Sequence, residues 1–480
     1  MRSVSRASTT TTTVANGRRG RRATMTRSAA TNGAAATESG DGRSRLYCGL
    51  DFGTSSARLA LVDDDGRLVR SHARGYEAPD SKTGMTAPWL RAMWELLEAL
   101  DEDERGRMDA VAVDGTSGTV IIVDAENGEA LCAPYMYNDT FPDESARIRG
   151  IRNGPGKDST ESASSAACKL SRWFYVDGAQ SGDKSRATLL HHADWLAYQL
   201  HGRMGVSDFN NSLKLGFDPA PGVEAFPKWL RDAEFGYMLP SEVLAPGASF
   251  GRVRSDVADR LACSPSCEVI AGTTDSVAAF VASQAMDVGE CATSLGSTLA
   301  LKLISDARVD DLSAGVYSHR LNGRWLVGGA SNLGGWILRR FFSNDELEKL
   351  SARIDEDGIE PTEDYFEGVM LGFGVSVDEA ASMVESSRPN DDAQFVANLL
   401  GSIANVEARC YERMRELGAS SGARKVFTAG GGARNATWSA MRSSAMGGIP
   451  VVRSERDEAA YGAALLARQG RKGLDSYVPT

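Results

Sequence analysis

Histidine and cysteine are scarce in this sequence, and their spacing suits neither a metal site nor a disulfide framework. The 480 residues include five histidines and seven cysteines, and no histidine has the spacing of a metal ligand. Cys263 and Cys267 lie close together, but no second cysteine pair follows to complete a zinc site. We therefore expect reduced, mostly buried thiols. His191 and His192 are expected to fill the core or the surface rather than to bind a ligand.

Long apolar runs and an excess of basic charge are also missing. No apolar run reaches the length of about 20 residues that a membrane-spanning helix needs. The formal net charge is -11, and because the first 43 residues are basic, about -17 remains on the rest of the chain. Such a charge repels a polyphosphate backbone. We therefore expect neither a membrane nor a nucleic acid as a partner.

Acidic residues are absent from the first 37 residues, which carry seven arginines and a run of five threonines. This composition is typical of an organellar transit peptide, and a merely disordered tail is the alternative. No apolar stretch of suitable length follows the first charges, which argues against a secretory signal. We expect residues 1–43 to be a targeting segment. The remaining length of about 440 residues fits two domains, each with its own core.

Residues 46–62 contain an apolar run, a polar turn and a second apolar run, which predicts two strands joined by a tight turn. Gly53 allows the backbone to approach a ligand closely, and Thr54, Ser55 and Ser56 add hydroxyl and amide donors. Asp51 places a carboxylate at the mouth of the turn. Such a turn can hold a phosphate and its magnesium ion, although an ordinary hairpin has the same pattern.

Two later segments have patterns that would complement this turn. Residues 292–303 repeat the plan, with Gly296, Ser297 and Thr298 in the places of Gly53, Thr54 and Ser55. Residues 425–435 form a short apolar strand that leads into Gly430, Gly431 and Gly432 and then a helix. Glycines before a helix leave free amide groups for an anion or a nucleotide, and a flexible turn is the alternative.

These three segments, in this order, resemble the two phosphate loops and the adenosine loop of the FGGY carbohydrate kinases. The resemblance covers residues 46–467. Residues 114–119, 271–276 and 294–298 are most similar to the plant and cyanobacterial branch, which was first called xylulose kinase-like and contains D-ribulose kinases. The resemblance implies an α/β fold with two ribonuclease H-like domains and a cleft between them, which we expect at residues 44–271 and 272–480.

Two aspartates at the ends of predicted strands are candidates for the acceptor site. Residues 108–113 predict a buried strand that delivers Asp114, Gly115 and Thr116 at its carboxyl end, where ligands gather in open α/β sheets. The alternative is a simple turn between two strands. Xylulose kinases have His and Gln in this place and this chain has neither, so the resemblance favours ribulose binding by Asp114 and Thr116.

Asp275 follows a predicted strand at residues 268–271 and precedes a predicted helix at residues 276–285. An aspartate in this place can cap the helix, which is worth about 1 kcal/mol. In the similar kinases the Asp of this motif is the general base that takes the proton of the attacking sugar hydroxyl. We expect Asp275 to have that role.

The resemblance implies a role for each remaining site residue. The expected sugar contacts are Asp51, Ser55, Ser56, Asp114, Thr116 and Asp275. The expected ATP contacts are Thr54, Gly296, Ser297, Thr298, Gly335, Gly430, Gly431, Gly432 and Asn435. Asp51 is expected to hold Mg²⁺ through water. Residues 346–390 depart from the family pattern, which leaves open any lid or oligomer interface built from them.

The sequence therefore predicts an ATP-dependent and Mg²⁺-dependent kinase that converts D-ribulose to D-ribulose 5-phosphate. A D-xylulose kinase is the nearest alternative, because the two ketopentoses differ at one carbon. A polypeptide-binding ATP switch related to actin and Hsp70, and a nonenzymatic sugar sensor, are the others. The plant-like resemblance favours the plastid stroma, with the mitochondrion or the cytosol as alternatives, and a monomer or homodimer is expected.

Overall fold

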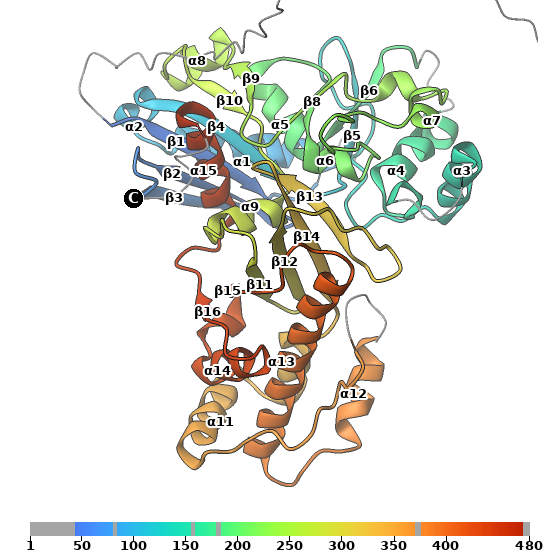
Figure 1. Cartoon of the computed structure of the whole chain (residues 1–480). Coiled ribbons are helices and arrows are strands. Elements are labelled where there is room, and N and C mark those ends of the chain that lie inside the picture. Colours follow the sequence, from blue (N-terminus) through green and yellow to red (C-terminus); the bar gives the residue numbers. More distant parts are fainter. Residues whose placement is uncertain (1–43, 80–83, 155–158, 179–183, 370–375, 474–480) are drawn as a thin grey trace, which may run out of the picture. The chain divides into compact units, whose positions relative to one another are not determined.

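Two six-stranded sheets dominate the computed structural model, which describes residues 44–79, 84–154, 159–178, 184–369 and 376–473 (Figure 1). The predicted targeting segment, residues 1–43, lies outside the described residues. The described residues after Arg43 belong to one compact unit. The boundary expected between residues 271 and 272 therefore stays a prediction.

The first sheet contains the predicted strand–turn–strand segment at its centre. Its strands, in spatial order, are β3 (Leu68–Gly75), β2 (Ser56–Val62), β1 (Leu46–Phe52), β4 (Met108–Gly115), β10 (Glu268–Ile270) and β9 (Ser249–Arg252). β1 is antiparallel to β2 and parallel to β4, and β4 is parallel to β10. The ends of β1 and β4 that carry Asp51 and Asp114 therefore meet at one edge of the sheet.

The second sheet repeats this plan around the second hairpin. Its strands, in spatial order, are β13 (Tyr317–Leu321), β14 (Arg324–Ser331), β12 (Leu299–Ser305), β11 (Glu290–Leu295), β15 (Lys425–Ala429) and β16 (Val451–Arg453). β11 is antiparallel to β12 and parallel to β15, as β1 is to β2 and β4. The predicted α/β fold with two sheets of related plan is confirmed.

Shorter strands and the helices complete the described residues. Two small sheets pair β5 (Val120–Asp124) with β6 (Ala187–His191), and β7 (Val206–Asp208) with β8 (Glu242–Leu244). The helices before β11 are α1 (Thr86–Glu98), α2 (Glu102–Gly106), α3 (Pro142–Arg152), α4 (Ala166–Arg172), α5 (His192–His201), α6 (Phe209–Leu213), α7 (Lys228–Arg231), α8 (Ser255–Leu261) and α9 (Asp275–Ala282). The later helices are α10 (Gly335–Phe341), α11 (Asn344–Asp357), α12 (Val377–Glu385), α13 (Asp392–Glu416), α14 (Ala436–Ala445) and α15 (Ala459–Lys472). None of the helices described is long and apolar enough to cross a membrane.

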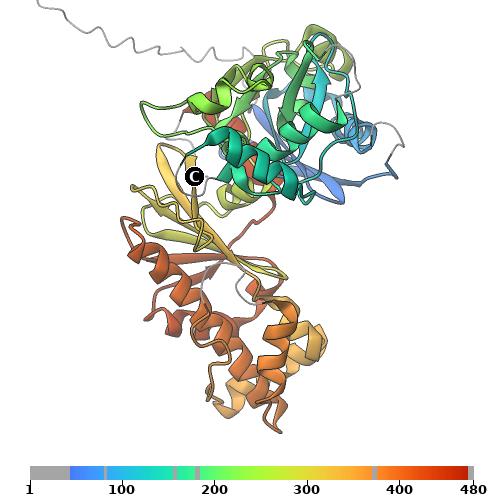
Figure 2. The same cartoon turned by 90° about the vertical axis from the view of Figure 1, so that its right-hand side faces the viewer.

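Apolar faces explain how the helices cover the sheets. One face of the first sheet packs on α1, α5 and α8, whose buried residues form a single core with Leu50 and Val111. The other face packs on α9 and α15. Helices α10 to α14 cover one face of the second sheet, and Figures 1 and 2 show α11 to α14 gathered there. The long α13 buries an apolar stripe that includes Phe395, Leu399 and Val406.

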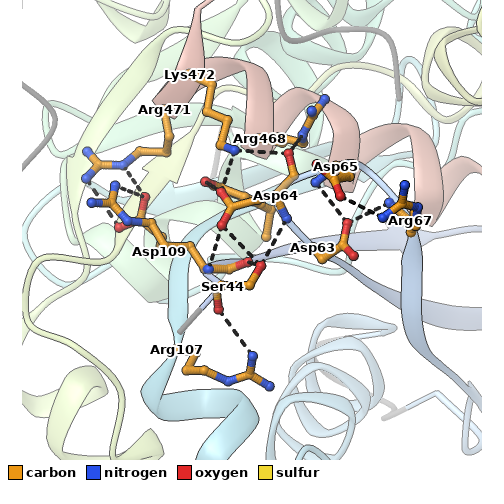
Figure 3. Close-up of polar contacts among 12 residues, drawn as sticks. Ser44, Asp63, Asp64, Asp65, Arg67, Arg107, Asp109, Arg468, Arg471 and Lys472 are labelled. Carbon is orange, nitrogen blue, oxygen red and sulfur yellow. Dashed lines mark hydrogen bonds and ion pairs between the residues drawn. The ribbon is translucent and has the colours of Figure 1, made fainter. Parts of the chain in front are cut away.

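The C-terminal helix α15 lies directly on β1 because glycine and alanine line the contact. A Cβ on Gly49 would lie 2.1 Å from the carbonyl oxygen of Ala460. Three basic residues in the last turns of α15 fasten it to the first sheet (Figure 3). Arg468 Nε donates to the Asp64 carbonyl at 2.7 Å, Lys472 pairs with the Asp64 carboxylate, and Arg471 Nε donates to Asp109 at 2.8 Å. Cations are favoured at this end of a helix by its dipole.

Replacing Gly462 of α15 with Ala is expected to destabilise the protein by about 1–3 kcal/mol, because the contact with α9 is overpacked. The new Cβ would lie 1.9 Å from the carbonyl oxygen of Ala278. Thermal unfolding measures the loss. Gly150 of α3 is the matched control, since nothing lies within 4 Å of a Cβ there and Ala favours a helix. A Gly462→Ala variant as stable as Gly150→Ala would contradict the close contact.

Candidate active site

Asp51 and Asp114 are direct neighbours on the parallel strands β1 and β4. The Asp51 side chain is 4% exposed, and Arg58 Nη1 donates to it at 3.3 Å. Asp114 is fully buried, and neither of its carboxylate oxygens has a hydrogen-bond partner within the described residues. Burial, and then the negative charge of Asp51, raises the pKa of Asp114 well above its usual range. A buried carboxylate pair of this kind needs a cation or a proton.

The first phosphate-type loop closes the β1–β2 hairpin beside Asp51. The Gly53 amide donates to the Ser56 carbonyl at 3.1 Å, and the Tyr76 hydroxyl donates to the Gly53 carbonyl at 3.1 Å. Thr54 and Ser55 are exposed, and Ser56 is half-buried. The predicted hydroxyl donors are therefore accessible on a turn that the neighbouring strand holds in shape.

The turn at residues 114–119 is held from inside the protein. His192 Nδ1 accepts from the Thr116 amide at 3.3 Å and lies 3.2 Å from the Thr116 hydroxyl, while its ring packs on Trp89. The Thr116 hydroxyl is also 2.7 Å from the hydroxyl of Thr119 and is buried. His192, expected as a core or surface filler, is a core residue that positions this turn. Thr116, expected as a sugar contact, has its hydroxyl engaged within the protein.

Two lysines also bind the carbonyl groups of this turn. Lys169 Nζ donates to the Gly118 carbonyl at 2.7 Å, and Lys214 Nζ donates to the Ser117 carbonyl at 3.3 Å. Burial lowers the pKa of Lys169 to about 8, helped by the charge of Lys214. The turn therefore presents its backbone with a fixed orientation.

Asp275 is the first residue of α9, and Thr274 occupies the N-cap position. The N-cap position is therefore one residue earlier than the capping alternative for Asp275 assumed. A bridge between Gly115 and Thr274 places the segment before Asp275 beside the turn at residues 114–119. Asp275 Oδ1 accepts from the Ser276 amide at 2.6 Å. Burial raises the pKa of Asp275 to about 6, although Lys214 and Lys302 oppose the rise. Such a carboxylate can accept a proton near neutral pH.

A cavity of about 640 Å³ gathers predicted nucleotide residues from separate segments of the chain. The predicted residues in its wall are Gly296, Gly335, Gly431, Gly432 and Asn435. The sequence did not single out the others that line it, including Arg339, Asn344, Glu348, Ser351 and Trp438. The volume is in the range of small-molecule sites. Of the lining residues, Glu348 and Ser351 of α11 belong to the stretch at residues 346–390 that departs from the family pattern.

Glycines let the loops around this cavity pack closely. Gly430 has φ of 85°, and a Cβ there would lie 2.7 Å from the Leu295 carbonyl. The Gly335 amide donates to the Gly296 carbonyl at 2.9 Å. The second phosphate-type loop at residues 296–298 therefore touches both glycine-rich segments. Its Ser297 and Thr298 side chains are exposed toward solvent.

Two side chains at the cavity already have protein partners. Asn435 caps α14 by accepting from the Trp438 amide at 2.9 Å, and its Nδ2 donates to the Ser351 hydroxyl at 2.8 Å. Arg339 Nη2 donates to the Ser297 hydroxyl at 2.9 Å. Asn435, expected as an ATP contact, thus shapes the cavity wall, while Arg339 brings a positive charge to the second phosphate-type loop.

A second cavity of about 950 Å³ is lined by hydroxyl and charged groups together with apolar side chains that include Phe217 and Phe226. Its polar wall includes Ser159, Ser162, Ser164, Lys214, Asp218, Arg308 and Tyr317. Lys214 and Tyr317 interact electrostatically with Asp275. The sequence analysis missed both. The sequence does contain a signal for Lys302, because this lysine interrupts the otherwise apolar strand β12 a few residues after the second phosphate-type loop.

The described residues contain no cluster of three or more His, Cys, Asp or Glu side chains that could hold a metal ion. Mg²⁺ commonly binds through one or two carboxylates together with waters and substrate phosphates. Asp51 and the unpartnered oxygens of Asp114 fit that kind of site.

Comparisons with known proteins show which proteins this chain is similar to. Residues 292–469 match the C-terminal domain of the FGGY family of carbohydrate kinases. Xylulose kinase of Staphylococcus xylosus is 18% identical over 459 residues, which cover 89% of this chain and 92% of that protein. Gluconokinase of Bacillus subtilis (strain 168) is 22% identical over 326 residues, which cover 65% of this chain and 62% of that protein.

The fold is that of solved kinases as well. The crystal structure of Plasmodium falciparum glycerol kinase with ADP has a TM-score of 0.70 and 16% identity, with 89% of this chain and 90% of that chain covered. Likeness at this identity shows the shared fold. The chain therefore shares the fold of these kinases, and its residues 292–469 are similar to the C-terminal domain of the FGGY family of carbohydrate kinases.

Proposed function

We propose that this chain transfers the terminal phosphoryl group of ATP to a hydroxyl of the ketopentose D-ribulose, giving D-ribulose 5-phosphate. The observation that carries the proposal is the cavity that brings Gly296, Gly335, Gly431 and Gly432 together. Three segments distant in the sequence bring these glycines together, so part of the wall presents backbone groups without side chains. This is the surface that a nucleotide needs for close approach.

Asp275 supplies the chemistry on the acceptor side. A sugar hydroxyl is a weak nucleophile, and a carboxylate at hydrogen-bond distance can take its proton as the oxygen attacks phosphorus. With a pKa near 6, Asp275 is largely ionised at neutral pH. Its electrostatic interaction with Lys214 and Tyr317, which line the second cavity, supports a sugar in that cavity.

The two phosphate-type loops and the carboxylate pair support the nucleotide side. Gly296, Ser297 and Thr298 would hold the phosphates of ATP, and Thr54, Ser55 and Ser56 would line the transfer point. Asp51, with Asp114 beside it, would hold Mg²⁺ through water. The metal would offset the charge of the phosphates. Loss of water from the closed site would protect ATP from hydrolysis.

D-Xylulose is the second candidate acceptor, because xylulose kinase of Staphylococcus xylosus aligns with most of the chain. The absence of His and Gln from residues 114–119 favours D-ribulose. One mispaired hydroxyl changes the ratio of kcat/KM between two acceptors by about ten- to a hundredfold. A peptide-binding switch or a sugar sensor needs no base in the position of Asp275.

The expected result is that the purified full-length chain releases ADP from Mg-ATP in the presence of D-ribulose, with kcat/KM at least about tenfold higher than for D-xylulose. A coupled assay for ADP measures both, and D-gluconate serves as a third acceptor. A preference for D-xylulose would overturn the assigned acceptor. ADP release that no sugar stimulates would favour the ATP switch, and sugar binding without turnover would favour the sensor.

A further inference from the structure

Lys302 lies on the face of the second sheet that looks toward α9. On β12 it points to the same face as Ala300 and Ile304, and Ile304 belongs to the core formed with α9 and α15. Directly beside Lys302 stands Gly328 of β14, and beside Gly328 stands Tyr317 of β13. Because Gly328 has no side chain, the Lys302 side chain has room above it, and its Cγ lies 3.8 Å from the place of a Cβ on Gly328. The lysine side chain can therefore extend along the sheet toward the site.

Lys214 reaches the same place from α6. The buried side chain of Asn210 fixes this helix, because it bonds both backbone groups of Arg320 on β13, at 3.0 and 3.1 Å. The Asn210 amide is also 3.0 Å from the Thr273 hydroxyl, two residues before Asp275. One amide thus ties α6, β13 and the start of α9 together. Lys214 at the end of α6 lines the hydroxyl-rich cavity.

The two ammonium groups lack the partners that buried lysines usually have. Neither Lys214 nor Lys302 forms an ion pair in the described part of the chain, and the protein contact of Lys214 is a carbonyl. Both interact electrostatically with Asp275. Burial lowers the pKa of Lys302 to about 8, so it is still mostly charged at neutral pH. Two positive charges therefore act on Asp275, and neither is held in an ion pair by a carboxylate of the described residues.

The cost of that arrangement falls when an anion is bound. We propose that Lys214 and Lys302 form an anion-binding pair that holds the phosphoryl group on the acceptor side of the site, during its transfer and in the sugar phosphate product. This rests on the proposed kinase function. The sugar oxygen bonds to phosphorus, the bond from phosphorus to the bridging oxygen of ATP breaks, and ADP leaves with the electron pair. The hydroxyl proton goes to Asp275.

Calorimetric titration of D-ribulose 5-phosphate and of neutral D-ribulose tests the pair. Lys302→Met is expected to weaken binding of the sugar phosphate about tenfold or more and to leave D-ribulose within about twofold. Lys214→Met also removes the contact to the Ser117 carbonyl, so it is expected to weaken both ligands, and the sugar phosphate more than D-ribulose. Lys302→Arg is expected to recover most of the phosphate affinity. Lys228→Met is the matched control, since Lys228 on α7 is 80% exposed and pairs with Asp232. Equal losses for both ligands, or no loss for the phosphate, would overturn the proposal.

The same titrations separate this proposal from the proposed function. One outcome is that the wild type phosphorylates D-ribulose while the lysine variants bind D-ribulose 5-phosphate as tightly as the wild type does. That result would support the kinase function and overturn the anion-binding role of the lysine pair. If the wild type binds inorganic phosphate through the lysines but neither binds nor phosphorylates D-ribulose, the pair stands and the acceptor falls. Tighter, lysine-dependent binding of D-gluconate would assign the pair to an acceptor carboxylate and overturn a phosphoryl role.

Discussion

Replacing Asp275 with Asn is expected to lower kcat with D-ribulose by at least about a hundredfold, because the amide cannot take the proton of the attacking hydroxyl. Asn has the same shape, and the Ser276 amide that donates to Asp275 Oδ1 can donate equally to an amide oxygen. The affinity for ATP is therefore expected to stay within about threefold, since the nucleotide cavity lies on other segments. Single-turnover kinetics and titration with Mg-ADP measure the two quantities separately.

The pH profile adds a second readout for the same residue. The pKa of Asp275 is raised to about 6 by burial, with Asp51 raising it further and Lys214 and Lys302 lowering it. A general base acts when it is ionised. The activity of the wild type is therefore expected to rise with pH through an apparent pKa near 6 and to level off above it.

The remaining activity of the Asp275→Asn variant is expected not to rise with pH in this range. Asp259→Asn, at an exposed position of α8, is the control for a carboxylate lost elsewhere. Unchanged kcat in Asp275→Asn, or the same pH profile in both variants, would remove Asp275 from the role of base.

Replacing Glu407 with Gln is expected to lower the free energy of unfolding by about 3–5 kcal/mol, because it leaves the buried guanidinium of Arg442 without a countercharge. Both side chains are fully buried between α13 and α14. Arg442 donates to Glu407 Oε1 at 2.7 Å and to the Thr428 hydroxyl at 2.9 Å. Glu407 also accepts from the hydroxyl of Thr293.

This network ties two helices to the strands that lead into the nucleotide loops. Thr293 of β11 and Thr428 of β15 are direct neighbours in the sheet. The loop with Gly296 follows β11, and the loop with Gly430 follows β15. Weaker binding of ADP is therefore expected along with the loss of stability in the Glu407→Gln variant.

Chemical denaturation measures the effect, and the chain offers a matched control on the same helix. Glu412 of α13 pairs with Arg415 at the surface, where both side chains are about half exposed. The Glu412→Gln variant is expected to lose far less stability, since water screens exposed pairs. The double variant Glu407→Leu with Arg442→Met is expected to recover much of the loss, because no buried charge remains. Equal losses for Glu407→Gln and Glu412→Gln would contradict the buried pair.

Much of the fold could be predicted because its strands and helices have clear local patterns. The apolar runs around Gly53 and Gly296 predict two similar hairpins, and both are found as β1–β2 and β11–β12. The helix predicted at residues 276–285 is found as α9 at Asp275–Ala282. Boundaries moved by a few residues where capping decided them, as at α9, which begins at Asp275 behind Thr274.

The candidate site was predictable where a short motif contains its own chemistry. Gly296, Gly335, Gly431 and Gly432 were expected around one nucleotide and line one cavity. Thr116 and Asn435 were expected as ligand contacts, yet their side chains serve the protein itself. Which hydroxyl or amide is already engaged depends on partners such as His192 and Ser351, which lie far away in the sequence.

The sequence by itself determined the loops and the aspartates at the strand ends, because glycine, hydroxyl and carboxylate groups at fixed short spacing express their chemistry locally. Only the tertiary structure decided the environment of those groups. Lys302 in an apolar strand has the same local pattern whether its face meets water or α9, and Lys214 is close to Asp275 because Asn210 joins α6 to β13. Burial and charge act through space, so the pKa of Asp275 and the positive pair beside it follow from packing between distant segments.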